Sequence, residues 1–315
     1  MSSVLAMTMP KLPKESDKLI QLSNSVKGEL LYNEPMSKHT SWRVGGQADC
    51  YFKPKDIADL SVFLKNWKSD NPIYWVGLGS NLLVRDGGIR GTVIMTSGLL
   101  NGISILDENI VRAEAGVACP KVSRFSAKND LVSAEFLSGI PGTIGGALKM
   151  NAGAFGGETW DRIESVETID RGGNLHHRYP GEYKVSYRSV VGLDDEWFVA
   201  ARFKLTKGDG EKSLAGIKVL LEKRNGSQPT NQPSCGSVFR NPENDYAARL
   251  IETSGLKGMT IGGARVSEKH ANFIVNTGNA TAADIEQLID VVRTSVEQQH
   301  GVRLVQEAHV IGEVL

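Results

Sequence analysis

Apolar and polar residues alternate along the chain in short runs that predict a mixture of strands and helices. Near the start, residues 48–53 and 73–76 have the pattern of strands. The segment between them repeats apolar residues at helical spacing, with one face made of Ile57, Leu60, Leu64 and Trp67. This order of strand, helix and strand predicts a small α/β unit.

The middle of the chain is richer in predicted strands. Two pairs of apolar runs enclose short polar turns and predict β-hairpins, at 103–106 with 110–115 and at 166–170 with 175–179. A long strand is predicted over 197–205 and a helix over 119–129. We therefore expect mainly β-structure here.

The last third alternates helices and strands again. A polar helix over 210–224 would lead into it, followed by a strand at 238–239, a helix over 246–253 and a strand over 271–276. The strongest helical signal begins at Thr281, with Asp284 three residues on as its capping partner. Its apolar stripe consists of Ile285, Leu288, Ile289, Val292 and Val296. Gly301 would end this helix, and a final strand is predicted over 303–311.

Composition and charge exclude several classes of protein. The 36 basic and 36 acidic residues cancel, whereas a nucleic-acid surface needs an excess of lysine and arginine. Cys50, Cys119 and Cys235 lie far apart without a CxxC pair, so we expect neither disulfides nor a metal site, and we favour the reducing cytoplasm. No apolar run reaches the ~20 residues of a membrane span. Residues 1–18 lack the pattern of a signal peptide.

Two glycine-rich segments, 77–91 and 138–157, carry the first chemical signal. Glycines can simply form turns, because they adopt positive φ at no steric cost. They can also let backbone N–H groups reach a phosphate. The sequence has no GxxxxGK[ST] motif, which excludes a P-loop, and Leu82 replaces the third glycine of GxGxxG, which argues against a Rossmann site. Backbone donors between the strands of an α+β domain remain.

Ser237, within PSCGSVFRNP at 233–242, has three conceivable roles: a nucleophile, a proton donor or a turn residue. A hydrolase elbow needs GxSxG, but Cys235 and Phe239 occupy the glycine positions. His270 is the candidate for the adjacent base that a serine nucleophile requires. Cys235 is a rival nucleophile, although a free cysteine is more often a small buried residue. The local sequence argues against a nucleophile and leaves the other two roles open.

The chain also carries longer motifs in a fixed order. They are HTSWRVGG at 39–46, GLGSNLLVRDGG at 77–88, FLSGIPGTIGGALKMNAGAFGGE at 136–158, SYRS at 186–189, PSCGSVFRNP at 233–242, LIETSGLKGMTIGGARVSEKHANFIVN at 250–276 and LVQEAHVIG at 304–312. Together these motifs resemble those of the UDP-N-acetylenolpyruvoylglucosamine reductase family, from Leu19 to Leu315.

The resemblance implies an α+β protein with an FAD-binding fold of the vanillyl-alcohol-oxidase (PCMH) type. The FAD-binding domain would cover 19–208, as two α+β subdomains at about 19–80 and 81–208. A C-terminal α+β substrate-binding domain would cover 209–315, and residues 1–18 would form a flexible tail. The short spacing between Arg188 and Ser237 resembles the family's shorter form, which lacks a tyrosine-bearing loop.

The implied activity is NADPH-dependent reduction of UDP-N-acetylglucosamine enolpyruvate to UDP-N-acetylmuramate in peptidoglycan synthesis, by a monomer. NADPH would reduce FAD, and the reduced flavin would deliver a hydride to the enolpyruvyl ether. Arg188 would stabilise the enolate-like charge, Ser237 would donate the proton, and Glu307 would orient the substrate or share in proton transfer. The family's Glu-Pro-Glu is Val305-Gln306-Glu307 here, and its second glutamate falls on Glu307.

The resemblance also assigns binding residues. For FAD they are Arg43, Gly77, Gly79, Ser80, Asn81, Leu82, Gly139, Ile140, Pro141, Gly142, Thr143, Gly145, Asn151 and Gly153, and for the UDP-sugar they are Tyr187, Arg224, Asn241 and Lys257. Two of the catalytic candidates have simpler interpretations. Arg188 could form a surface salt bridge, and Glu307, on its predicted strand, could face solvent.

Two other functions stay open at this point. A non-catalytic or oxidase member of the same flavin fold would bind FAD but not this substrate. Such oxidases commonly attach the flavin to a histidine or cysteine beside the first glycine loop, and residues 75–91 contain neither. A purely binding protein would not need Arg188, Ser237 and Glu307 together. A serine hydrolase would lack its elbow.

Overall fold

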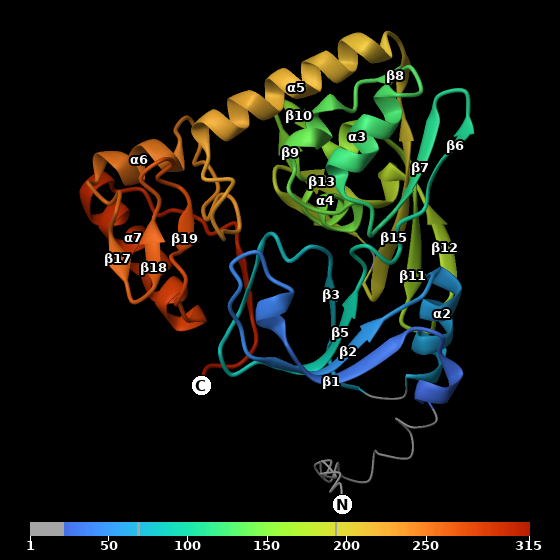
Figure 1. Cartoon of the computed structure of the whole chain (residues 1–315), viewed down its shortest axis with the longest axis horizontal. Helices are drawn as coiled ribbons and strands as arrows, with labels where there is room; N and C mark the ends of the chain where they lie inside the picture. Colours follow the sequence, from blue (N-terminus) through green and yellow to red (C-terminus); the bar gives the residue numbers. More distant parts are fainter. Residues whose placement is uncertain (1–21, 68–69, 193) are drawn as a thin grey trace, which may run out of the picture.

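The computed structural model describes residues 22–67, 70–192 and 194–315 and arranges them in three units (Figure 1). The expected tail at 1–18 lies outside the described residues. The first unit is a four-stranded sheet in the order β1-β2-β5-β3. Its strands are β1 (Glu29–Pro35), β2 (Gln47–Lys53), β3 (Ile73–Val76) and β5 (Ile89–Met95), and helix α2 (Ile57–Asn66) follows β2.

Strand β5 lies between β2 and β3 and is parallel to both, and all of its residues except Arg90 are buried. Such burial is typical of a parallel strand covered on both faces. The predicted helix is confirmed, with Leu60, Phe63 and Leu64 buried. Because β5 belongs to this sheet, we propose that the two subdomains meet within residues 96–102, after the expected boundary near residue 80.

The second unit is a five-stranded antiparallel sheet in the order β12-β11-β15-β7-β6. Its strands are β6 (Ile103–Asp107), β7 (Ile110–Glu114), β11 (Ile163–Asp170), β12 (Leu175–Arg178) and β15 (Glu196–Lys204). Both predicted hairpins and the long strand are confirmed. Helices α3 (Cys119–Ala127) and α4 (Ile144–Met150) share the apolar core of this unit.

Shorter elements connect these parts. They are η1 (Met36–Lys38), β4 (Leu82–Val84), β8 (Leu131–Val132), η2 (Glu135–Gly139), β9 (Gly153–Ala154), β10 (Gly157–Glu158), η3 (Thr159–Arg162), η4 (Pro180–Glu182), β13 (Lys184–Ser186), β14 (Ser189–Val191) and β16 (Thr206–Lys207). Among the described residues, no helix is long and apolar enough to cross a membrane.

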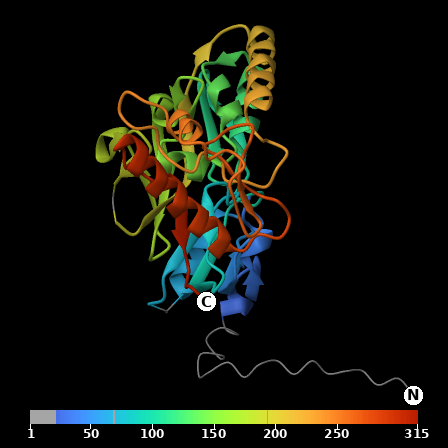
Figure 2. The ribbon, with the colours of Figure 1, turned by 90° about the vertical axis from the view of Figure 1, so that its left-hand side faces the viewer.

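Helix α5 (Gly210–Ser227) leads to the third unit along the top of Figure 1, as the polar pattern predicted. The third unit consists of α6 (Ala247–Thr253), β17 (Thr260–Ile261), β18 (Ala264–Val266), β19 (Ile274–Asn276) and α7 (Ala282–His300). Figure 2 views the molecule from this unit, with α7 in the foreground. The predicted stripe of α7 is buried, its Thr281–Asp284 capping box forms, and Gly301 has φ +67°.

The third unit is joined to the first by buried contacts. Trp42 lies in its apolar core, with no exposed surface, and donates a hydrogen bond from Nε1 to the Ile274 carbonyl at 2.7 Å. The chain then returns through β20 (His309–Ile311), which pairs in parallel with β4. Asp86, just after β4, accepts hydrogen bonds from the first turn of α7. These links hold the first glycine loop against the C-terminal unit.

Three predicted strands are absent or too long. Residues 238–239 form no strand, because the side chain of Asn272 takes both backbone groups of Phe239. The predicted strand over 303–311 is reduced to β20, and Gln306 makes only an isolated bridge with Phe239. Glu307 therefore lies in an irregular segment before a strand. The predicted strand over 271–276 is likewise shortened to β19.

Candidate active site

A cavity of about 560 Å³ lies where the glycine loops meet the third unit. Gly77, Ser80 and Pro141 line one side, and residues 230–236 line another. Lys38, His39, Arg43 and Arg224 also line it, and no carboxylate is among the described lining residues. Its volume lies within the range of small-molecule sites, and its excess of cations suits an anionic ligand.

The first glycine loop has its shape because side chains would not fit. Gly79 has φ +64°, and a Cβ there would lie 2.1 Å from the His39 carbonyl oxygen. A Cβ on Gly77 would lie 2.3 Å from the Thr143 hydroxyl, so the two glycine loops are in close contact. This packing leaves the Gly77–Ser80 backbone at the cavity surface, where a phosphate could approach it.

The second glycine loop leads into α4 and is anchored to the end of β7. The backbone N–H groups of Ile144 and Gly145 donate to Val117 and Ala115, at 2.9 and 2.8 Å. Thr143 precedes α4, but its buried hydroxyl makes no hydrogen bond within the described part of the chain. A buried hydroxyl without a partner is costly, and a bound ligand would satisfy it.

Arg188 and Glu307, far apart in sequence, meet as an ion pair. Arg188 lies in the turn between β13 and β14 with φ +54°, and its Nε is 3.0 Å from Glu307 Oε1. The angle is poor for a hydrogen bond, so the buried Nε–H has no well-aligned acceptor among the residues that the structure describes. The terminal nitrogens donate instead to the carbonyls of Asn151 and Gly153, at 3.4 and 3.1 Å. The guanidinium is thus fixed with part of its donor capacity unused.

Glu307 is held in place by its backbone. Its N–H donates to the Val238 carbonyl at 2.7 Å, and its carbonyl accepts from the Asn81 side chain at 3.0 Å. Burial raises the pKa of Glu307, and the charges of Arg188 and Arg240 oppose this rise without cancelling it. A carboxyl group with a raised pKa beside an arginine is typical of a functional site.

Ser237 lies next to this pair through its chain neighbour. The Val238 carbonyl accepts from Glu307, and Gly236 on the other side has φ +82°. Ser237 is half-buried, and its hydroxyl makes no hydrogen bond to any described residue. The structure therefore pairs Arg188 with Glu307 and holds the backbone of the residue after Ser237 against Glu307. We propose that the Ser237 hydroxyl is available for another partner.

The expected FAD residues fall into groups. Arg43, Gly77, Ser80 and Pro141 line the cavity. Gly79, Gly142, Thr143 and Gly145 shape the two loops. Asn81, Asn151 and Gly153 contact the Arg188–Glu307 pair. Leu82 pairs with His309 between β4 and β20, Gly139 packs under Phe155, and Ile140 is buried in the core.

The four expected substrate residues are divided. Tyr187 is half exposed, and the Arg188 guanidinium lies 5.2 Å from its ring centre. Arg224 lines the cavity, and burial lowers its pKa. Asn241 accepts a hydrogen bond from the Ala247 N–H at the start of α6, and Lys257 forms an ion pair with Glu252. Only the first two therefore lie at the cavity or the Arg188–Glu307 pair.

Sequence reasoning did not identify three residues of this region. Lys38 and His39 line the cavity, and Arg240 acts electrostatically on Glu307. His39 and Arg240 lie within family motifs, and Lys38 directly precedes one, which was the available signal. Cys235 also lines the cavity, but burial raises the pKa of its thiol well above the usual value, which disfavours the thiolate. Burial also lowers the pKa of His270.

Comparisons with known proteins identify the families that this chain resembles. The model of a family described as an FAD binding domain matches residues 48–178. A second family model, described as the C-terminal domain of UDP-N-acetylenolpyruvoylglucosamine reductase, matches residues 228–311. The predicted α+β class and the predicted FAD-binding domain are confirmed.

Full-length relatives point the same way. UDP-N-acetylenolpyruvoylglucosamine reductase of Alkalilimnicola ehrlichii is 57% identical over 286 residues, covering 91% of this chain and 96% of the relative. The protein of that name from Legionella pneumophila is 55% identical over 287 residues, covering 91% and 95%. The crystal structure of the Thermus caldophilus reductase aligns with a TM-score of 0.75 at 31% identity, covering 90% of this chain and 98% of that one.

Proposed function

The chain belongs to the UDP-N-acetylenolpyruvoylglucosamine reductase family, and we propose that it performs the reaction implied by that name. It would reduce UDP-N-acetylglucosamine enolpyruvate to UDP-N-acetylmuramate with NADPH and FAD, in peptidoglycan synthesis. The observation that carries this proposal is the meeting of Arg188, Glu307 and the Ser237 segment. Each comes from a different motif of the family.

The residues present fit FAD. The cavity between the glycine loops carries cations without a described carboxylate, as a diphosphate requires. The Gly77–Ser80 backbone, Arg43 and Thr143 would hold the cofactor there. The chemistry that the flavin supplies when bound is hydride transfer from NADPH to the enolpyruvyl double bond. The other steps require the side chains of this chain.

The hydride adds to the terminal carbon of the enolpyruvyl group, and negative charge then builds on the neighbouring carbon and its carboxylate. Arg188 stabilises this charge, because its guanidinium is fixed by the Asn151 and Gly153 carbonyls. Glu307 keeps Arg188 in this orientation. The proton that completes the reduction passes from the Ser237 hydroxyl to the carbanion-like carbon, and solvent later restores it.

The oxidase alternative lacks comparable support. A residue set that stabilises an enolate and delivers a proton serves a reductase, and an FAD-binding protein without this substrate would not need it. The cytoplasm is part of the proposal, because Cys50, Cys119 and Cys235 are all free and buried, as a reducing compartment favours. A monomeric state stays a prediction.

The direct test is to purify the protein and record its visible spectrum. We expect a bound flavin, and NADPH consumption with the enolpyruvyl sugar should yield UDP-N-acetylmuramate by mass spectrometry. A colourless protein that FAD does not reconstitute would contradict the cofactor assignment. A yellow protein that reacts with oxygen but leaves the sugar unchanged would favour the oxidase alternative.

A further inference from the structure

The charge of Arg240 acts on Glu307, and its guanidinium has no partner among the described residues. Segments 238–240 and 305–307 run antiparallel, with Phe239 opposite Gln306. The Arg240 N–H donates to the Val305 carbonyl at 2.8 Å, and the Glu307 N–H donates to Val238. In an antiparallel pair, opposite residues share a face and successive residues alternate. Arg240 and Glu307 therefore lie on the same face of this short pairing.

The Arg240 guanidinium forms no hydrogen bond or ion pair with the described residues, and its Nε is buried without a partner. Arginines in such positions are normally paired, because an unpaired buried donor is costly. Its charge nevertheless acts locally. Burial raises the pKa of Glu307 and Arg240 opposes that rise, whereas burial lowers the pKa of His309 and Arg240 lowers it further. The folded chain thus keeps a second positive charge close to the carboxylate that Arg188 contacts.

We propose that Arg240 is a positioning residue of the reduction site, whose charge keeps Glu307 in the ionised form that pairs with Arg188. This inference rests on the proposed function. Arg240 acts through Glu307 and not on the substrate. Its effect is on the orientation of Arg188, because a protonated Glu307 would no longer hold the guanidinium by charge.

The charges around Glu307 support this role. Arg188 faces it from the β13–β14 turn, and Cys235 and Arg240 belong to the serine segment. The charges of Arg240 and Lys149 also act on His309, whose pKa is lowered first by burial and then by these two cations. Burial favours the neutral carboxyl and only the two arginines oppose it. Removing one arginine therefore shifts the balance toward the protonated form.

The test compares Arg240→Met and Arg240→Lys in the full-length holoenzyme, by the pH profile of reduced-flavin reoxidation at saturating enolpyruvyl sugar. One limb of this pH–rate profile should depend on ionisation of Glu307 and should therefore be absent in Glu307→Gln. The midpoint of this limb should move to higher pH by about one pH unit in Arg240→Met and by much less in Arg240→Lys. NADPH reduction of the flavin and flavin content should not change. Arg249→Met, which removes an exposed arginine paired with Asp245, is the matched control and should leave the limb in place.

Two results would overturn the inference. One is an unmoved limb in Arg240→Met together with a raised KM for the sugar, which would make Arg240 a direct ligand. The other is an equal shift in Arg249→Met. Thermal denaturation against pH is a readout without turnover: the effect of Arg240→Met should disappear in a Glu307→Gln background. That result would support the charge coupling even if the wild-type protein proved inactive, which would contradict the proposed function alone.

Discussion

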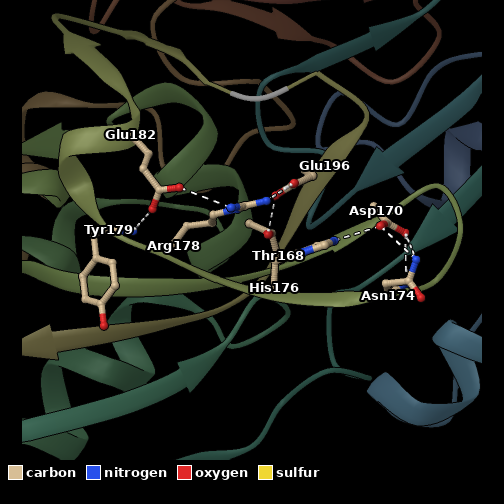
Figure 3. Close-up of polar contacts among 8 residues, drawn as sticks. All are labelled: Thr168, Asp170, Asn174, His176, Arg178, Tyr179, Glu182 and Glu196. Carbon is tan, nitrogen blue, oxygen red and sulfur yellow. Dashed lines mark hydrogen bonds and ion pairs between the residues drawn. The ribbon is translucent and has the colours of Figure 1, made fainter.

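Two arginine–glutamate pairs in this molecule are alike in composition and opposite in electrostatics. Arg178 binds Glu196 on the sheet of the second unit with two hydrogen bonds, at 3.1 and 2.6 Å, and Thr168 adds a third at 2.7 Å (Figure 3). Arg188 reaches Glu307 by one poorly aligned contact. The pKa of Glu196 is lowered although burial opposes it, whereas burial raises the pKa of Glu307.

Exposure of the side chain does not explain this difference. The exposed fractions of the two glutamate side chains are 11% for Glu196 and 13% for Glu307. Glu307 lies deeper in the protein, and its carboxylate receives fewer hydrogen bonds. The first pair is therefore satisfied and structural, as is the adjacent Asp170–His176–Asn174 cluster of Figure 3. The second keeps a carboxylate and a guanidinium only partly satisfied, which suits a site that receives a charged substrate.

The largest expected contrast is in turnover. Arg188→Met should slow reoxidation of the reduced flavin by the enolpyruvyl sugar by about 10²–10³-fold, because a fixed charge that stabilises the developing enolate is lost. Arg178→Met removes the same charge from the structural pair and should change this rate less than about twofold. Anaerobic stopped-flow absorbance measures both. Equal losses in the two variants would mean that the pairs do not differ in role.

The second contrast concerns stability. The raised pKa of Glu307 means that its ionised form destabilises the folded protein near neutral pH, so Glu307→Gln should leave the melting temperature unchanged or raise it. Glu196→Gln should lower it, because the lowered pKa of Glu196 shows that ionisation favours folding. Differential scanning fluorimetry of the holoenzymes at neutral pH measures both, and a lower melting temperature for Glu307→Gln would contradict this account.

The changes in melting temperature caused by Glu307→Gln and Glu196→Gln should have opposite signs at neutral pH, and both should become smaller in acid. The Glu307 contribution is fully present below its unfolded-state pKa and is lost as pH rises through its raised folded pKa. The Glu196 contribution is present above its unfolded-state pKa and is lost as pH falls through its lowered folded pKa. The melting temperature difference between wild type and Glu196→Gln should therefore shrink in acid. For Glu307→Gln, the gain relative to wild type should shrink in acid too, because wild-type Glu307 becomes neutral there.

The smallest effect is expected from Thr168→Val. The hydroxyl of Thr168 is buried and donates to Glu196, so its removal should lower the free energy of unfolding by about 1 kcal/mol. Reductase activity should not change, because the contact belongs to the structural pair. Urea denaturation with a parallel activity assay tests this, and a loss of turnover would show that the two pairs are coupled.

The sequence predicted helices and strands correctly where apolar residues recur at a regular spacing. The α7 stripe, its Thr281 capping box and Gly301 are all in place, because each depends on residues within the same helix. The strand predicted over 303–311 was too long, since its first residues meet a segment whose backbone is bonded to the Asn272 side chain. Hydrogen bonds between segments far apart in the sequence cannot be predicted from the alternation of apolar and polar residues within one segment.

The site was predictable only through motifs. Nothing in the sequence places Arg188 against Glu307, because their contact depends on how the β13–β14 turn lies against the C-terminal segment. The Arg178–Glu196 pair was not predicted at all, since isolated charges on strands carry no pattern that identifies a partner. Arg240 stands inside a matched motif, but the role that we propose for it follows from its guanidinium. This group has no partner in the described part of the chain, and its charge acts on Glu307.

We propose that Ser237 supplies the proton while Arg188 stabilises the negative charge and Glu307 orients Arg188. The most direct measurement is single-turnover mixing of Ser237→Ala, first with NADPH and then with the enolpyruvyl sugar, under anaerobic conditions. We predict a normal rate of flavin reduction and a reoxidation slowed by about 10²–10⁴-fold, the usual contribution of a positioned proton donor. Reoxidation at the wild-type rate would remove Ser237 from the mechanism.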